Sequence, residues 1–255
     1  MNRGKKEGDA QEIVCTKLLN LNIDHYSKVL NIQNNDDLFA LRVTNKKHSS
    51  IHSKKVLPKS DIIICRGLIP KKILIESDYY LEEELIKKFN LKFVENSGIS
   101  VKLKNSKKYT ITKMGISTFN KLFNDLNLGC GASIYCNSEN EIYKNKNVIE
   151  AWGTDENKFQ SYFRDRINSD IQINYLTDLK KIKSYSNNMI KDIILNNKNL
   201  YDIILKGIGM FEDPFCCNYM MKDDELVEIK NVNFKITTGS GRSKGVFTIV
   251  VKPSQ

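Results

Sequence analysis

The sequence predicts an α+β or α/β protein with a mixed β-sheet flanked by helices. Three observations support this prediction: helical spacing opens the chain, strand-like segments follow, and a long helical stretch precedes the strands at the end. A chain of 255 residues can bury a core without disulfides or metal ions. We predict one domain over residues 1–255, with a core over 8–128 and 225–252. A helical insertion is expected over about 150–210.

The first elements alternate between helix and strand signals. Asp9-Ala-Gln-Glu12 resembles a capping box, and apolar residues at helical spacing follow it as far as Leu21. Residues 37–44 fit a first strand. The run Val56–Cys65 is rich in β-branched residues, which predicts a strand covered on both faces.

The middle of the chain predicts two helices around a hairpin. Ser77 and Asp78 are expected to cap a helix, because apolar residues recur every four positions after them. Polar and apolar residues alternate over 99–103 and again over 109–112, which predicts a hairpin between these segments. A second helix is expected from Ser117 until two glycines, Gly129 and Gly131, end it.

The end of the chain returns to strands. Residues 155–209 have helical spacing, whereas the pattern has a period of two over 226–230, 233–237 and 246–251. A Gly-Ser-Gly turn separates the last two segments, so we expect a C-terminal β-hairpin.

The charge distribution favours a polyanionic partner. Lys and Arg total 40 against 30 acidic residues, for a formal net charge of +10. Nine basic residues and a single acid, Asp61, lie between Arg42 and Lys72, and five lysines without an acid lie between Lys102 and Lys113. Because segregated positive charge attracts phosphate backbones, we expect a nucleic acid partner. The alternative is a solvated lysine-rich surface.

The cysteines and the apolar runs favour a cytoplasmic protein. The six cysteines form no C-x-x-C pair, and the three histidines complete no zinc spacing, so we expect reduced structural thiols. Every apolar run is far shorter than the roughly 18 residues of a membrane span, and the charged start carries no secretory signal. We therefore expect no membrane association.

One pair of segments carries candidate chemistry. Asp61 leads the buried strand, while Ser100 and Lys102 lie two apart on the next strong strand and share a face, opposite Val101. A carboxylate and an ammonium at one sheet edge can hold Mg²⁺ against a phosphate and orient water. The core is expected to receive Ile99, Val101 and Leu103. Alternatively, Asp61 is a turn residue and Lys102 is solvated.

These segments resemble a known superfamily. Pro58-Lys-Ser-Asp61 followed by Gly98-Ile-Ser-Val-Lys102 is similar to the PD-(D/E)xK nucleases, particularly type II restriction endonucleases of the Msp and HinP kind. Ser100 stands where the motif usually has Glu. The stretch between Asp61 and Ser100 is long, which implies an insertion over 67–98.

The resemblance implies a Mg²⁺-dependent, site-specific deoxyribonuclease with a restriction-endonuclease-like fold. Asp61, Ser100 and Lys102 would be catalytic, and Asp61, Glu12 and Ser100 would form the metal site. Glu12 matches an acid that assists metal binding in the superfamily, and Glu95 is the second choice. The product ends would be a 5′-phosphate and a 3′-hydroxyl. The alternative for Glu12 is the capping box itself.

Double-stranded DNA is the expected partner, together with a cognate DNA methyltransferase of the same restriction-modification system. A homodimer and a monomer both remain open. The glycines of Thr237–Gly245 allow close approach to a backbone, and the loop carries two basic residues. The residues expected to contact DNA are Lys54, Lys55, Lys104, Lys107, Lys108, Arg242 and Lys244.

Two other functions compete with this hypothesis. A non-catalytic basic nucleic-acid-binding protein would need only the basic stretches, with Asp61 as a structural residue. A CRISPR-type RNA-binding subunit is the third hypothesis, because Gly239–Gly245 is similar to the glycine-rich loops of those proteins. The three hypotheses predict different results. The nuclease should make Mg²⁺-dependent cuts in duplex DNA, the non-catalytic protein should show salt-sensitive binding without cleavage, and the RNA-binding subunit should prefer single-stranded RNA.

Overall fold

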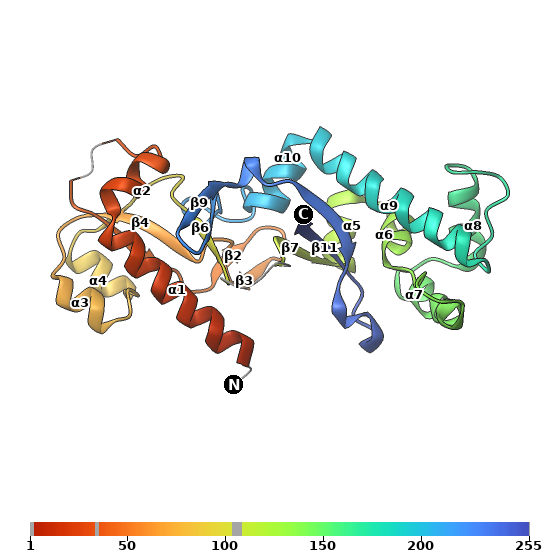
Figure 1. The fold of residues 1–255 in the computed structure, drawn as a ribbon, viewed down its shortest axis with the longest axis horizontal. Helices are drawn as coiled ribbons and strands as arrows, with labels where there is room; N and C mark the ends of the chain where they lie inside the picture. The colour runs from red at the N-terminus through yellow and green to blue at the C-terminus, as the bar shows by residue number, and fades with distance from the viewer. Residues whose placement is uncertain (1–2, 34–35, 104–108, 255) are drawn as a thin grey trace. The chain divides into compact units, whose positions relative to one another are not determined.

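The computed structural model describes residues 3–33, 36–103 and 109–254 (Figure 1). The protein is a mixed α/β structure, with 46% helix and 20% strand, and it contains a mixed sheet, as predicted. Within the described ranges, every helix is too short or too polar to cross a membrane.

The contacts within the chain define two compact units. The first comprises residues 1–109 and 202–232, and the second comprises 110–201 and 233–255. The predicted single core over 8–128 and 225–252 is therefore divided between the units. The physical reason is that the strand after residue 109 pairs with the C-terminal strands instead of with the preceding strand.

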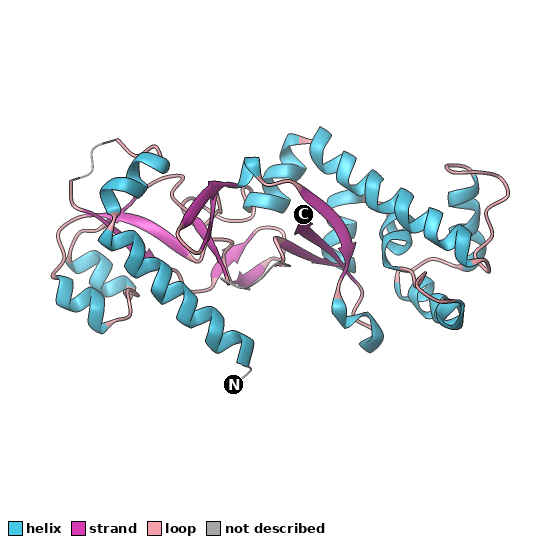
Figure 2. Cartoon of the chain, in the orientation of Figure 1, coloured by secondary structure: helices cyan, strands magenta, loops and turns pink. Residues whose placement is uncertain are grey.

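The first unit is built around a six-stranded mixed sheet (Figure 2). Its helices are α1 (Arg3–Leu21), α2 (Ile23–Val29), α3 (Lys71–Glu76), α4 (Glu83–Lys88) and the wider π-helical turn η2 (Asp202–Lys206). A short 3₁₀ turn, η3 (Ile229–Asn231), follows its last strand. The strands are β1 (Leu38–Arg42), β4 (Ile62–Arg66), β5 (Lys92–Phe93), β6 (Ile99–Lys102), β8 (Tyr219–Lys222) and β9 (Glu225–Glu228).

The strand order is β1-β4-β6-β8-β9, and β5 pairs with β4. The pair β6–β8 is parallel and the other pairs are antiparallel. A separate two-stranded ribbon is formed by β2 (Lys47–Ser49) and β3 (Lys54–Val56). The strand predicted over 37–44 is confirmed as β1, and the one predicted over 99–103 is confirmed as β6.

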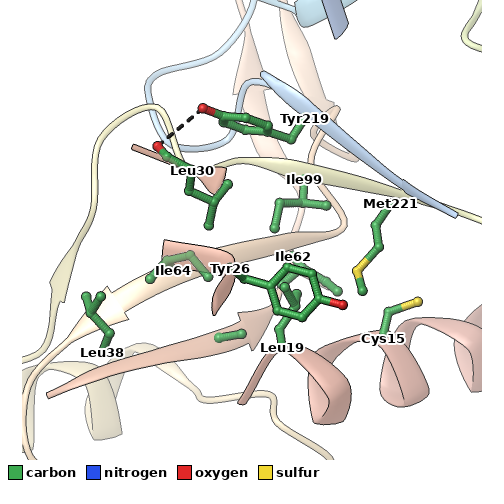
Figure 3. Packing of buried hydrophobic residues seen from close by; sticks show 11 residues of the cluster. Cys15, Leu19, Tyr26, Leu30, Leu38, Ile62, Ile64, Ile99, Tyr219 and Met221 are labelled. Carbon is green, nitrogen blue, oxygen red and sulfur yellow. Dashed lines mark hydrogen bonds between the residues drawn. The ribbon is translucent and has the colours of Figure 1, made fainter. Parts of the chain in front are cut away.

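The two faces of this sheet are both covered. On one face, Ile62, Ile64 and Ile99 pack against α1 and α2 in a buried cluster (Figure 3), where the Tyr219 hydroxyl donates a hydrogen bond to the Leu30 carbonyl oxygen at 3.2 Å. On the other face, the alternate β4 residues Ile63 and Cys65 pack in a second cluster with leucines from α3 and its neighbouring loops. The prediction of a strand covered on both faces is confirmed for β4, which begins at Ile62 and not at Val56, where β3 ends.

Two predictions in this unit were wrong. Ser77 and Asp78 do not start a helix: α3 ends at Glu76, and Asp78 and Tyr79 have φ values of 49° and 61°. Left-handed backbone reverses the chain there, so the apolar residues that suggested one helix enter the core from a turn and from α4. The hairpin between 99–103 and 109–112 is also absent, because β6 pairs with β4 and β8.

The second unit contains the three-stranded antiparallel sheet β10-β11-β7 and most of the long helices. Its strands are β7 (Thr112–Gly115), β10 (Phe234–Thr238) and β11 (Thr248–Pro253). Its helices are α5 (Ile116–Phe123), α6 (Leu126–Ser133), α7 (Asn145–Ala151), α8 (Glu156–Arg164), α9 (Leu176–Asn196) and α10 (Lys198–Tyr201). Two 3₁₀ segments, η1 (Glu139–Lys144) and η4 (Ser240–Lys244), lie in its loops. The antiparallel pair β10–β11 confirms the C-terminal hairpin.

Gly129 and Gly131 do not end a helix, contrary to the prediction, but lie inside α6. A Cβ atom on Gly129 would lie 2.3 Å from the Trp152 ring, and one on Gly131 would lie 2.3 Å from the Ser186 hydroxyl oxygen. These glycines therefore let neighbouring side chains approach the helix closely. The sequence signal of a helix-ending glycine is the same as that of a packing glycine.

Candidate active site

Asp61 immediately precedes β4, where its backbone is hydrogen-bonded to β6 and to the segment after β1. Its backbone N–H donates to the Ile99 carbonyl oxygen at 2.8 Å, and its own carbonyl oxygen accepts from the Val43 N–H at 2.8 Å. Its carboxylate Oδ2 accepts from the Val101 N–H at 2.8 Å and from the Ser100 hydroxyl at 3.0 Å. The carboxylate is therefore fixed against β6.

Lys102 completes a chain of hydrogen bonds that begins at Asp61. Its Nζ atom donates to the Ser100 Oγ atom at 2.7 Å, and that hydroxyl in turn donates to Asp61. Ile99 is buried and Val101 is partly buried on the opposite face, as the alternation predicts. Leu103 is 36% exposed, so the predicted core position is wrong there, because β6 ends at Lys102.

Burial raises the pKa of the Asp61 carboxyl, whereas the positive charge of Lys102 and the hydrogen bonds from Val101 and Ser100 lower it. The site therefore removes a carboxylate from much of the solvent and compensates that cost with donors from one neighbouring strand. A perturbed carboxyl beside a lysine is typical of functional sites.

Glu12 of α1 is the second carboxylate that acts on this site. Its Oε2 atom lies 3.3 Å from Nη2 of Arg42, and the two side chains are only 21% and 10% exposed. Burial and then the negative charge of Asp61 raise the pKa of Glu12 to about 7, although Arg42 opposes this shift. Glu95, the second choice, acts instead on Asp213, whose pKa its charge helps to raise.

Lys59 also belongs to the candidate site. The sequence indicated it only as one of the nine basic residues between Arg42 and Lys72. Its side chain is partly buried, and its Nζ atom donates to the Ile204 carbonyl oxygen in η2 at 2.8 Å. Burial, together with the positive charge of Lys102, lowers its pKa to about 8. Its position two residues before Asp61, inside the Pro58–Asp61 motif, was the signal that could have identified it.

Gly207 is required for this placement of Lys59. Its φ is +79°, and a Cβ atom there would lie 2.6 Å from the Lys59 Cγ atom. The close approach therefore needs a residue without a side chain, and it lets η2 lie beside the lysine stem.

The cysteines behave as buried thiols. All six are free and buried, as predicted: Cys15, Cys65, Cys130, Cys136, Cys216 and Cys217. Cys217 interacts electrostatically with Lys59, Lys102 and Asp61, but burial raises its pKa to about 11. Its protonated Sγ donates to the Tyr219 carbonyl oxygen at 3.0 Å. A protonated thiol is a weak nucleophile and a weak ligand, so Cys217 serves packing.

The donor set around Asp61 fits a hard divalent cation. Within the described ranges, three or more His, Cys, Asp or Glu side chains nowhere gather into a metal-binding group, so a site here would rest on two carboxylates, Asp61 and Glu12, and the Ser100 hydroxyl. Mg²⁺ is commonly bound by one or two carboxylates plus substrate phosphates and water. The mutual repulsion of Asp61 and Glu12 is the kind that a divalent cation relieves.

The residues expected to contact DNA have different surroundings. Lys54, Lys55 and Lys244 are exposed. Arg242 is hydrogen-bonded within the second unit. Its Nη1 atom donates to the carbonyl oxygens of Ser133 and Ile134 at 3.0 and 2.7 Å. Its guanidinium carbon lies 3.7 Å from the centre of the Tyr135 ring. The other three residues, Lys104, Lys107 and Lys108, lie outside the described residues.

The chain has no match among protein-family models or among curated proteins.

Proposed function

We propose that the protein is a Mg²⁺-dependent endonuclease that hydrolyses phosphodiester bonds of duplex DNA at a short specific sequence, as a type II restriction endonuclease does. The observation that carries this proposal is the hydrogen-bonded series Lys102–Ser100–Asp61 at the ends of two neighbouring strands. The resemblance of these segments to the PD-(D/E)xK motif supports the restriction-endonuclease-like form of the mixed sheet.

Asp61 and Glu12 would hold the Mg²⁺, which supplies charge neutralisation at the phosphate when it is bound. Lys102 is the group that orients the attacking water and stabilises the developing negative charge, since an ammonium has three donors and Ser100 receives one of them. Ser100 replaces the usual acid with a neutral hydroxyl. In this role it links the ammonium to the carboxylate and fixes the position of both.

The basic surface supplies the affinity for DNA. The net charge is +10, and Lys54 and Lys55 are exposed on neighbouring positions of β3. Contacts of this kind bind phosphates without reading sequence. A DNA methyltransferase that protects the same sequence is the partner that a restriction endonuclease requires, and a homodimer is the arrangement suited to a symmetric site.

The test is cleavage of plasmid DNA with Mg²⁺, with Ca²⁺ and with a chelator. We expect discrete fragments with Mg²⁺ only. Asp61→Ala and Lys102→Ala should each reduce the cleavage rate by more than about 100-fold, since even outer-shell changes cost 10–100-fold. Both variants should still bind the DNA.

The matched controls are Asp24→Ala and Lys72→Ala, which remove the same charges from exposed positions of the first unit. They should cleave at the rate of the parent protein. Salt-sensitive binding without cleavage under any divalent ion would instead identify a non-catalytic binding protein. A preference for single-stranded RNA would support the third hypothesis.

A further inference from the structure

A cavity of about 210 Å³ lies in the first unit, on the sheet face occupied by Leu41 and Ile63. Phe93 and Phe215 form a corner of it, with ring centres 5.7 Å apart and an interplanar angle of 78°. Phe93 is 38% exposed, so the aromatic corner is accessible from solvent. The cavity therefore offers ring surfaces to a ligand.

Polar and cationic groups stand at the edge of these apolar walls. The Lys47 Nζ atom lies 4.6 Å from the centre of the Phe215 ring and 3.7 Å from Oε1 of Glu83, which also lines the cavity. The Tyr80 hydroxyl donates to Asn45 Oδ1 at 2.6 Å, which fixes the amide and leaves its Nδ2 protons as the donors that Asn45 offers to a ligand. The edge thus combines a lysine–glutamate ion pair with an oriented amide.

Two residues of the cavity wall also contact residues of the candidate active site. Arg42 lines the cavity and also pairs with Glu12 at 3.3 Å. The next residue, Val43, lines the cavity too, and its backbone N–H donates to the Asp61 carbonyl oxygen. A ligand in the cavity therefore lies next to the strand end that holds the candidate catalytic carboxylate.

The chemistry of the cavity selects its ligand class. Its volume is below the roughly 300–1,000 Å³ of clefts for drug-sized molecules, so it suits one or two fused rings. Aromatic walls bind the faces of nucleobases, and an amide reads their edges. We propose that this cavity receives one unstacked nucleobase of the bound DNA, an inference that rests on the proposed nuclease function.

The test places the fluorescent base 2-aminopurine at successive positions of a duplex that spans the mapped cleavage site. The duplex is bound by the Asp61→Ala variant, so that it stays uncut. Because an unstacked 2-aminopurine is brighter than a stacked one in a duplex, we expect a several-fold rise in emission at one position and little change elsewhere.

The second variant replaces the exposed wall of the cavity. Phe93→Ala, in the Asp61→Ala background, should abolish the emission rise and weaken binding about tenfold, because base–aromatic stacking is worth ~1–3 kcal/mol. Leu68→Ala is the control, since Leu68 is a 75% exposed apolar residue of the same unit that does not line the cavity. It should leave both quantities unchanged.

The outcomes separate this inference from the proposed function. A duplex that is cut and bound without an emission rise at any position overturns the nucleobase cavity and leaves the nuclease intact. A duplex that is neither bound nor cut refutes the proposed function. A third outcome is that free 2-aminopurine deoxyribonucleoside monophosphate changes its emission on binding and that this change requires Phe93, while no position in the duplex responds. This result would assign the cavity to free nucleotides and would overturn the inference.

Discussion

Each unit contains a cluster of partly buried charged groups, and the two clusters differ in what the charges contact. In the second unit, Lys183 donates to the carbonyl oxygens of Ala132 and Ile134 at 2.9 and 3.0 Å and to the Thr238 hydroxyl at 2.7 Å. Arg242 binds the carbonyl oxygens of Ser133 and Ile134. These groups satisfy carbonyls at the C-terminal end of α6, which have no partners within the helix.

In the first unit the charges face one another instead. Lys102 reaches Asp61 through Ser100, and Asp61 and Glu12 repel each other across a partly buried site. Burial of charge is common to both clusters, so burial alone does not indicate function. The informative feature is the hydrogen-bonded series from an ammonium through a hydroxyl to a carboxylate, on which the charge of a second carboxylate acts, an arrangement that a helix end does not need.

Ser100→Ala should produce the largest effect that distinguishes the clusters. The change removes the hydroxyl that joins Lys102 to Asp61, and we expect a 10–100-fold loss in cleavage rate with only a small loss in thermal stability, because the Val101 N–H still donates to Asp61. Plasmid cleavage kinetics and a melting curve measure the two quantities. The corresponding change in the second unit, Thr238→Ala, should leave the cleavage rate unaltered, and an equal loss there would remove the distinction.

Lys183→Met should lower the free energy of unfolding by ~1–3 kcal/mol, because it removes the hydrogen bonds of Lys183 to the carbonyl oxygens of Ala132 and Ile134 and to the Thr238 hydroxyl. Denaturant unfolding followed by circular dichroism measures this loss. Lys181→Met on the same helix is the control, since the Lys181 side chain is 57% exposed and bonds only across the surface to Asp178. Equal stability of the two variants would show that the bonds of Lys183 contribute little.

The pH dependence of the free energy of unfolding should show the titration of Lys183. Burial, together with the positive charge of Arg242, lowers the pKa of Lys183 from 10.5 to about 8, and the nearby Cys136 opposes this shift. Between these values the unfolded chain binds more protons than the folded one, so this group makes stability rise as the pH rises. Unfolding of the parent protein and of Lys183→Met at several pH values should show that their difference in stability increases with pH. A constant difference would contradict the lowered pKa.

The smallest effect concerns the basic loop. Lys244 is exposed, so Lys244→Ala should weaken DNA binding modestly. The magnitude of the slope of the logarithm of the binding constant against the logarithm of the salt concentration should fall by about one, because one fewer counterion is released. Arg242→Ala should instead lower thermal stability, because its donors are bonded to α6. Binding titrations at several salt concentrations and melting curves separate the two residues. If Arg242→Ala changed the salt dependence of DNA binding more than Lys244→Ala does, Arg242 would be a DNA-contacting residue and this prediction would be wrong.

The sequence predicted the centre of the candidate site better than its surroundings. The alternation over residues 99–103 fixes the shared face of Ser100 and Lys102, and the apolar run after Asp61 places that residue at a strand end. Both signals are local. The burial of Lys59 depends on η2, which lies more than a hundred residues later, and the role of Arg242 depends on the end of α6.

Strand pairing was the least predictable feature for the same reason. The alternating pattern identifies a strand and its faces but not its neighbour. The strand β7 follows β6 closely in sequence yet pairs with β11, whereas β6 pairs with β8. The division into two compact units follows from these long-range pairings, which a local sequence pattern does not specify.

The parallel pairing of β6 with β8 also affects the timing of folding during synthesis. Ile99–Lys102 lies beside Tyr219–Lys222, and the whole of residues 110–201 is translated between them. The strand that carries Ser100 and Lys102 therefore leaves the ribosome long before its parallel neighbour exists. A nascent chain that has not reached Tyr219 lacks one neighbour of that strand, so the candidate site is completed only after residues 219–222 have been synthesised.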